Sequence, residues 1–242
     1  MNITADYHTH TIYSHGKGTI EDNVKSAISK GLKTIGISDH GYKHMGFGIK
    51  YKDIPKMREE IDMLREKYPN INILMGIEAN ILDDKGNIDV DDKVRKYFDY
   101  VMAGYHFGST PTKLIKGTLN HIINFLGPLK KNAIEYNTNA VVNTMKKNDI
   151  FIITHPGAKA MIDLIEVAKV AKETDTALEI NSKHGHLTIE ELKLIKDSGV
   201  KFAIGSDAHE AEDVGNFIDG IYRAKKAGID MKSIINIDGE MK

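Results

Sequence analysis

Seven short runs of apolar and β-branched residues recur along the chain, and longer stretches with the spacing of amphipathic helices separate most of them. This alternation predicts parallel βαβ units, because parallel strands need a crossover connection that is usually helical. We expect strands at 3–8, 34–40, 71–80, 100–106, 150–155, 177–181 and 201–207, and helices at 19–30, 53–67, roughly 117–147, 159–173, 188–198 and 213–227.

The chain of 242 residues has no linker rich in Pro, Gly or Ser between these units. Seven such units predict one α/β domain over residues 1–242, with the strands in a single closed or nearly closed barrel, rather than two small domains. The acidic stretch 82–97 is predicted to be a solvated loop that leads into a short helix.

Composition narrows the chemistry that is open to the chain. It contains no cysteine, so His, Asp and Glu are the only strong metal ligands. A formal charge of −1 provides no overall basic field for nucleic acid or an anionic membrane surface. The sequence has neither a leader-like start nor a run of about 18 apolar residues, which predicts a cytoplasmic protein.

Nearly every predicted strand ends in, or is followed by, a residue that can bind a metal. In a parallel barrel the carboxyl ends of the strands meet at one face, so residues far apart in sequence converge there. The nine candidate ligands are His8, His10, His15, His40, Glu78, His106, His155, Asp207 and His209. A zinc ion takes about four ligands, so this number predicts two or three ions that share ligands.

Each of these residues also has an ordinary interpretation, such as a surface pair for His8 and His10. Glu78 is harder to dismiss, because a buried carboxylate without a partner or a cation is strongly disfavoured. Seven of the eleven histidines lie at or just beyond the carboxyl ends of the predicted strands. Histidines placed at random in a barrel core would not gather at one end of its strands. Asp39, which precedes His40, is predicted to orient a ligand imidazole.

Other residues near the predicted strand ends are candidates for substrate binding. The loops after the second and sixth strands carry His44, His184 and His186, for which substrate contact and ordinary loop polarity remain open. Asn181 ends the sixth strand, the only one for which we identify no ligand, and is predicted to bind substrate or metal-bound water. The loop cations Lys17, Lys159 and Lys183 either add positive charge or are simply solvated, and His121 is predicted to be a solvated or packing residue.

Together these motifs resemble the PHP (polymerase and histidinol phosphatase) family, and most closely its YcdX-like, histidinol-phosphatase-like phosphatase branch. The motifs are DYHTHT, YSHG, SDHG, GIEANI, AGYH, ITHPG, EIN and GSDAH, over about residues 3 to 235. The resemblance implies a distorted (β/α)7 barrel, like a TIM barrel, and a trinuclear centre of zinc, manganese or iron. It assigns His8, His10, Glu78 and Asp207 to the first ion, His15, His40 and His209 to the second, and Glu78, His106 and His155 to the third.

The resulting hypothesis is a metal-dependent phosphatase that hydrolyses a small phosphomonoester through a metal-activated hydroxide. Asp207, Glu78 and His209 are its candidate catalytic residues, and His44, Lys159, Asn181, Lys183 and His184 its candidate substrate residues. The segments 107–116 and 182–187 match no substrate-reading motif, and a homo-oligomer is left open.

Two other functions compete with this hypothesis. One is a phosphodiesterase or 3′-exonuclease, although the sequence shows no basic, aromatic-lined stripe to hold a strand. The other is a non-catalytic, metal-stabilised interaction domain, although a complete ligand set would not be expected to persist there.

Overall fold

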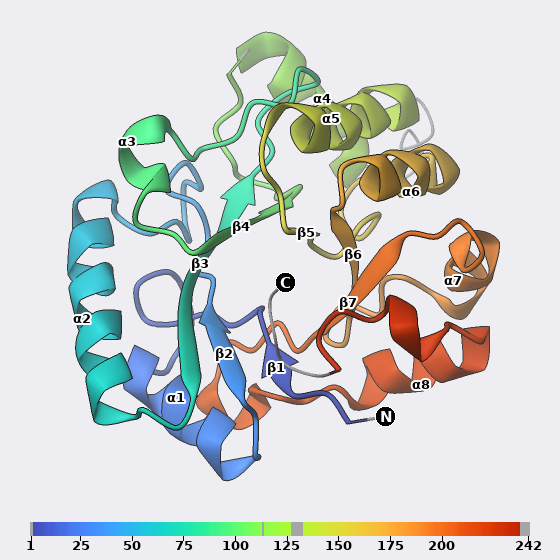
Figure 1. Ribbon diagram of the computed structural model, residues 1–242. Coiled ribbons are helices and arrows are strands. Elements are labelled where there is room, and N and C mark those ends of the chain that lie inside the picture. The colour runs from blue at the N-terminus through green and yellow to red at the C-terminus, as the bar shows by residue number, and fades with distance from the viewer. Residues whose placement is uncertain (1, 113, 127–132, 238–242) are drawn as a thin grey trace.

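The computed structural model describes residues 2–112, 114–126 and 133–237. Seven parallel strands, paired in sequence order, curve into a nearly closed barrel (Figure 1). The strands are β1 (Ala5–Asp6), β2 (Thr34–Ile37), β3 (Asn72–Asn80), β4 (Tyr100–Gly104), β5 (Ile152–Ile153), β6 (Ala177–Asn181) and β7 (Lys201–Gly205). The predicted α/β barrel is therefore confirmed.

Helices surround the barrel and cover the outer faces of its strands (Figure 1). They are α1 (Ile20–Ser29), α2 (Ile54–Lys67), α3 (Asp92–Arg95), α4 (Leu114–Phe125), α5 (Ile134–Lys147), α6 (Leu164–Glu173), α7 (Ile189–Ile195) and α8 (Ile218–Ala227). Short 3₁₀ helices lie at Tyr51–Asp53, Ala211–Asp213 and Met231–Ser233. None of the helices in the described part of the chain is both long and apolar enough to cross a bilayer.

The predicted helices differ from the observed ones in three places. The stretch 117–147 contains two helices, α4 and α5, and residues 127–132 between them lie outside the described residues. Helix α6 begins at Leu164 rather than 159, because Asp163 caps its first turn by accepting from the Ile165 and Glu166 amides. Helix α8 begins at Ile218, after a separate 3₁₀ turn at 211–213.

Hydrogen bonds at both ends of the barrel join β1 to β7. At the carboxyl end, Ala208 donates to the His8 carbonyl over 3.2 Å and accepts from the His10 amide over 2.8 Å. At the other end, the buried side chain of Asn236 donates to the carbonyls of Ala5 and Ile204, each over 2.8 Å. The first and last strands are thus held together, which fixes the relative positions of the residues that follow them.

The inside of the barrel is filled by a small apolar cluster around Tyr100. Its ring needs glycine on two neighbouring strands, because a Cβ at Gly36 would lie 2.0 Å from the Tyr100 hydroxyl and one at Gly76 would lie 2.2 Å from the ring. The hydroxyl donates to the Tyr7 carbonyl over 2.6 Å. This packed layer closes the barrel beneath the strand ends, so that the polar residues gather above it.

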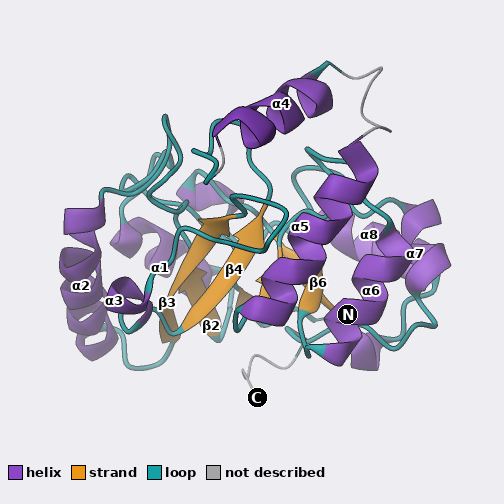
Figure 2. Cartoon of the chain, turned by 90° about the horizontal axis from the view of Figure 1, so that it is seen from above, coloured by secondary structure: helices purple, strands orange, loops and turns teal. Residues whose placement is uncertain are grey.

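Helix α4 stands apart from the other helices, above one end of the barrel (Figure 2). Polar side chains connect it to its neighbour α5: Asn120 and Asn124 both donate to the side-chain oxygen of Asn137. Nδ1 of His121 lies 2.8 Å from the Tyr105 hydroxyl, which favours packing over solvation for this residue.

Candidate metal centre

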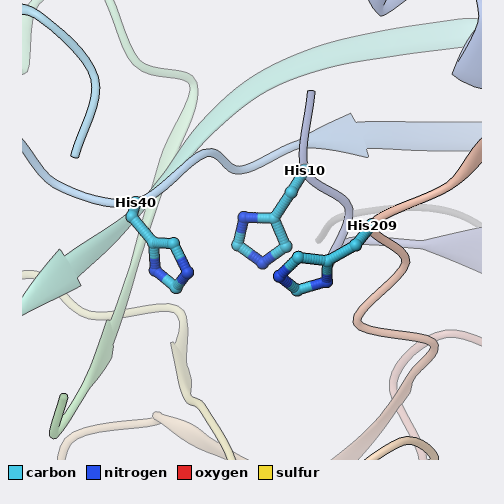
Figure 3. A group of neighbouring side chains, drawn as sticks. All are labelled: His10, His40 and His209. Atoms are coloured by element: carbon cyan, nitrogen blue, oxygen red, sulfur yellow. The ribbon is translucent and has the colours of Figure 1, made fainter. Parts of the chain in front are cut away.

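All nine predicted ligands lie together at the carboxyl end of the barrel. Seven of them are buried, and only His15 and His209 are partly exposed. Figure 3 shows how His10, His40 and His209, which come from three distant parts of the sequence, turn their rings toward one another. The strand ends explain this convergence, because β1, β2, β4, β5 and β7 end two or three residues before a ligand and β3 carries Glu78 near its carboxyl end.

Glu78 occupies the middle of the cluster. Its Oε1 atom lies 3.1 Å from Nε2 of His106 and 3.0 Å from Nε2 of His155. Its Oε2 atom lies 2.8 Å from Nδ1 of His40 and 3.4 Å from Nε2 of His8. The two oxygens of this one carboxylate therefore face two different sets of imidazoles.

The remaining ligands form further close groups. Nε2 of His10 lies 3.1 Å from Nε2 of His8 and 3.4 Å from Oδ1 of Asp207. Potential ligand atoms of His10, His40 and His209 all lie within 4.8 Å of one another. The His15 ring stacks against His40, with ring centroids 4.9 Å apart, and meets His209 edge-on at 4.2 Å.

These residues fit the divalent metal ions that the sequence pattern implies. Oε2 of Glu78 and Nδ1 of His40 are buried and 2.8 Å apart, yet neither is in hydrogen-bond geometry with any described group. Nδ1 of His10 and Nδ1 of His15 are likewise buried without a partner. Buried polar atoms cost free energy unless they are satisfied, and a cation between them satisfies several at once.

The electrostatics of the cluster also suit cations. Burial lowers the pKa of His106 and of His209 to about 4 each, and that of His15 to about 3. These imidazoles are neutral at pH 7 and keep a lone pair for a metal. Burial alone would raise the pKa of Glu78, but His106, His8 and His40 outweigh it and hold that pKa well below its usual range.

Residues behind the cluster fix the orientation of its imidazoles, and sequence reasoning missed them. Nδ1 of His106 lies 2.9 Å from Oδ1 of Asn80, whose own amide group donates to the buried carboxylate of Asp89 over 2.7 Å. On the opposite side, Nδ1 of His8 lies 2.6 Å from Oε1 of Glu179 in β6. The signal for Glu179 was available: like Glu78, it is a carboxylate within an apolar strand.

One sequence prediction about a supporting residue is wrong. Asp39 does not orient an imidazole; its carboxylate accepts from the Thr11 amide over 2.7 Å, from the Thr11 hydroxyl and from Ser14. The physical reason is that consecutive side chains of an extended chain point to opposite sides, so Asp39 faces away from the ring of His40. For Lys17, the solvated alternative holds, because its side chain is exposed and pairs with Glu210.

A cavity of about 280 Å³ opens above the cluster. Four of the predicted substrate residues line it: His44, Lys159, Lys183 and His184. Nε2 of His184 lies 3.2 Å from Oδ2 of Asp207, and the Lys183 ammonium contacts Nδ1 of His209. Phe47 and Phe107, which the sequence did not single out, form apolar parts of the wall.

The other two residues that were linked to substrate lie elsewhere. Asn181 is fully buried; its amide group donates to Glu179 and Asp207, and its oxygen accepts from the amides of Lys183 and His184. The ring of His186 is outside the cavity lining, with Nδ1 4.0 Å from the Glu191 carboxylate. Asn181 is therefore placed to support the cluster from below.

Comparisons with known proteins agree with this arrangement. The family model of the PHP domain matches residues 6–232. A probable phosphatase of Thermoanaerobacter sp. (strain X514) is 34% identical over 98% of this chain and 92% of its own. The DNA polymerase/3′-5′ exonuclease PolX of Bacillus subtilis (strain 168) is 28% identical over 97% of this chain, but the match spans only 39% of that protein.

Among solved structures, the histidinol phosphate phosphatase of Lactococcus lactis, which was crystallised with zinc, L-histidinol and phosphate, has a similar fold. The TM-score is 0.66, the identity is 19%, and the match covers 95% of each chain. The family model spans nearly the whole chain, and the predicted motifs meet at one end of a seven-stranded barrel. On this evidence the chain belongs to the PHP domain family.

Proposed function

We propose that this chain hydrolyses small phosphomonoesters at a centre of three divalent metal ions, which are zinc, manganese or iron. The first ion would be held by His8, His10, Glu78 and Asp207, the second by His15, His40 and His209, and the third by Glu78, His106 and His155. The observation that carries the proposal is the Glu78 carboxylate, whose two oxygens face separate sets of imidazoles.

The reaction class has independent support. Membership of the PHP family, with relatives named as probable phosphatases, makes the chain a metal-dependent phosphatase and hence a phosphoesterase. The monoester substrate, the number of ions and the residues assigned to each ion are our proposal.

When bound, divalent ions lower the pKa of a coordinated water and neutralise charge on the phosphate oxygens. The chain itself positions the ligands and moves the proton. Asp207 and His209 both line the cavity, so one of these two residues would accept the proton from the attacking water. Glu78 keeps the two sets of imidazoles at a fixed separation.

Residues that line the cavity would bind the substrate. Lys159 and Lys183 would bring positive charge to the phosphate, and His184 lies beside Asp207. His44 has less freedom, because its Nδ1 atom accepts from the Phe47 amide over 3.1 Å and so holds its own loop. Phe47 and Phe107 would pack against an apolar part of the leaving group.

A panel of three substrates tests the proposal. With added Mn²⁺ or Zn²⁺, the protein should hydrolyse para-nitrophenyl phosphate and leave bis-para-nitrophenyl phosphate and labelled single-stranded DNA largely intact. The relationship to PolX favours the nuclease alternative, and faster hydrolysis of the diester and DNA would establish it in place of our proposal. No hydrolysis of any substrate by metal-loaded protein would favour the non-catalytic alternative.

A further inference from the structure

Glu179 connects three of the strands that carry the cluster. Its carboxylate is buried in β6, with Oε1 2.6 Å from Nδ1 of His8, which follows β1. Oε2 accepts from the backbone amide of His155, which follows β5, over 2.8 Å, and from the side-chain amide of Asn181 over 2.9 Å. The same Asn181 amide group donates to Asp207, which follows β7, over 3.1 Å.

The contact with the His155 amide stabilises an unusual backbone conformation. His155 has a φ of 29°, in the left-handed region that a residue with a side chain rarely adopts. The turn at this residue directs the imidazole of His155 toward Glu78, at 3.0 Å. A buried hydrogen bond to a carboxylate is well suited to offset the cost of such a conformation.

The neighbouring strand makes room for the Glu179 side chain. A Cβ at Gly205 in β7 would lie 2.1 Å from Oε1 of Glu179. Any larger residue at this position would push the carboxylate away from His8. Glycine at position 205 and glutamate at position 179 therefore form one unit of the site.

We propose that Glu179 is a positioning residue for the metal centre, which fixes the tautomer and orientation of His8 and the backbone of His155 so that both imidazoles point their Nε2 lone pairs at the metals. The inference rests on the proposed function, because it concerns the affinity of that centre for metal. A carboxylate that accepts from the second ring nitrogen of a ligand histidine makes the first nitrogen a better ligand.

The substitution Glu179→Gln probes this role because a carboxamide cannot satisfy all three donors. If its oxygen faces His155 and Asn181, its NH₂ group faces Nδ1 of His8 and requires the tautomer with a proton on Nε2, where the metal should bind. If its oxygen faces His8, its NH₂ group faces two other N–H donors. Glu173→Gln, an exposed position at the end of α6, makes the same chemical change away from the site.

The experiment measures zinc binding per chain by titration, together with the imidazole N–H proton resonances of the zinc-loaded protein. Glu179→Gln should weaken the binding of at least one ion by about 10- to 100-fold and remove a downfield Nδ1–H resonance that Glu173→Gln retains. A second variant, Gly205→Ala, displaces the carboxylate without removing its charge and should act in the same direction. It carries the test if Glu179→Gln does not fold.

The possible outcomes separate the two proposals. Zinc affinity and resonances that match the wild type in both site variants would overturn the role of Glu179 and leave the proposed function standing. A variant that only unfolds at a lower temperature, with unchanged zinc affinity in its folded form, would also overturn it. A wild-type protein that binds no zinc or manganese would instead contradict the proposed function itself.

Discussion

Oε1 of Glu78 lies 3.0 Å from Nε2 of His155. The other oxygen of this carboxylate turns toward His8 and His40, so the negative charge of Glu78 is shared between two parts of the cluster. A residue placed in this way should affect more than one metal ion, whereas an imidazole at the edge of the cluster should affect one. This difference can be measured.

Glu78→Gln should lose more than one metal ion per chain and at least about 100-fold in hydrolysis of an aryl phosphate. The change preserves the shape of the side chain but replaces a shared negative charge with an amide, which bridges cations poorly. Elemental analysis of protein purified without chelator, together with initial rates, checks this. Glu173→Gln should change neither quantity. Full metal content with near-normal turnover in Glu78→Gln would refute the bridging role and the three-ion centre.

His106→Ala should lose chiefly one metal ion, because its imidazole is assigned to a single ion and its Nε2 atom lies 3.1 Å from one oxygen of Glu78. The same elemental analysis measures the loss. His121→Ala removes a histidine that contacts Tyr105 instead, so its metal content should equal that of the wild type. Equal losses from His106→Ala and Glu78→Gln would show that the ions bind all together or not at all.

The sequence allowed prediction of the parts of the site that depend on strand polarity. The carboxyl ends of the strands of a parallel barrel all lie at one face, so residues near these ends, such as Glu78 and Asp207, could be brought together without a structure. Glu179 was missed because only the end of its strand, Asn181, was considered. The break between α4 and α5 was also missed, although the Gly127–Pro128 pair is a helix-ending signal in the sequence.

Contacts between loops could not be predicted in the same way. The bonds from Thr11 and Ser14 to Asp39 depend on how the loop after β1 folds over β2, which no local pattern specifies. The pairing of Lys17 with Glu210 joins residues 193 positions apart. Such contacts follow from the closed barrel, so they become visible only once its geometry is known.

Lys183→Ala should raise the KM for the preferred phosphomonoester by about 10-fold with little change in metal content, the size expected when one charge-assisted contact to substrate is lost. Lys183 lines the cavity and contacts His209, whereas Lys17 is exposed and paired with Glu210. Lys17→Ala is therefore the matched control and should leave KM unchanged. A loss of metal from Lys183→Ala equal to its loss of activity would assign this lysine to support of His209 rather than to substrate.

Glu21 should contribute to stability in a pH-dependent way that is separate from the metal centre. The Tyr68 hydroxyl and the Lys67 and Lys25 ammonium groups lower the pKa of Glu21 to about 2. Because this folded-state pKa lies below the unfolded value of about 4.3, the contribution is fully present above pH 4.3 and is lost as the pH falls toward 2.

Urea unfolding of the metal-free protein tests this for Glu21→Gln. The variant should be slightly less stable than the wild type at pH 6, and the difference should shrink below about pH 4. Because Glu21 is only partly buried, added salt should also reduce the difference. A difference that is independent of both pH and salt would mean that Glu21 acts through packing rather than through its charge.

Removal of metal should lower both activity and thermal stability. Each ion that binds the folded chain and not the unfolded one stabilises it by about 2.7 kcal/mol at a free concentration 100 times its dissociation constant. For a chain of this length, one ion corresponds to about 5–10 °C in the unfolding midpoint. Prolonged treatment with chelator should therefore shift the midpoint down by at least this amount and abolish hydrolysis of para-nitrophenyl phosphate, and added Zn²⁺ or Mn²⁺ should restore both. The shift should be much smaller in Glu78→Gln, since that variant starts with fewer ions. Full activity after long incubation with strong chelator, with an unchanged midpoint, would mean that neither the fold nor the reaction of this chain depends on metal.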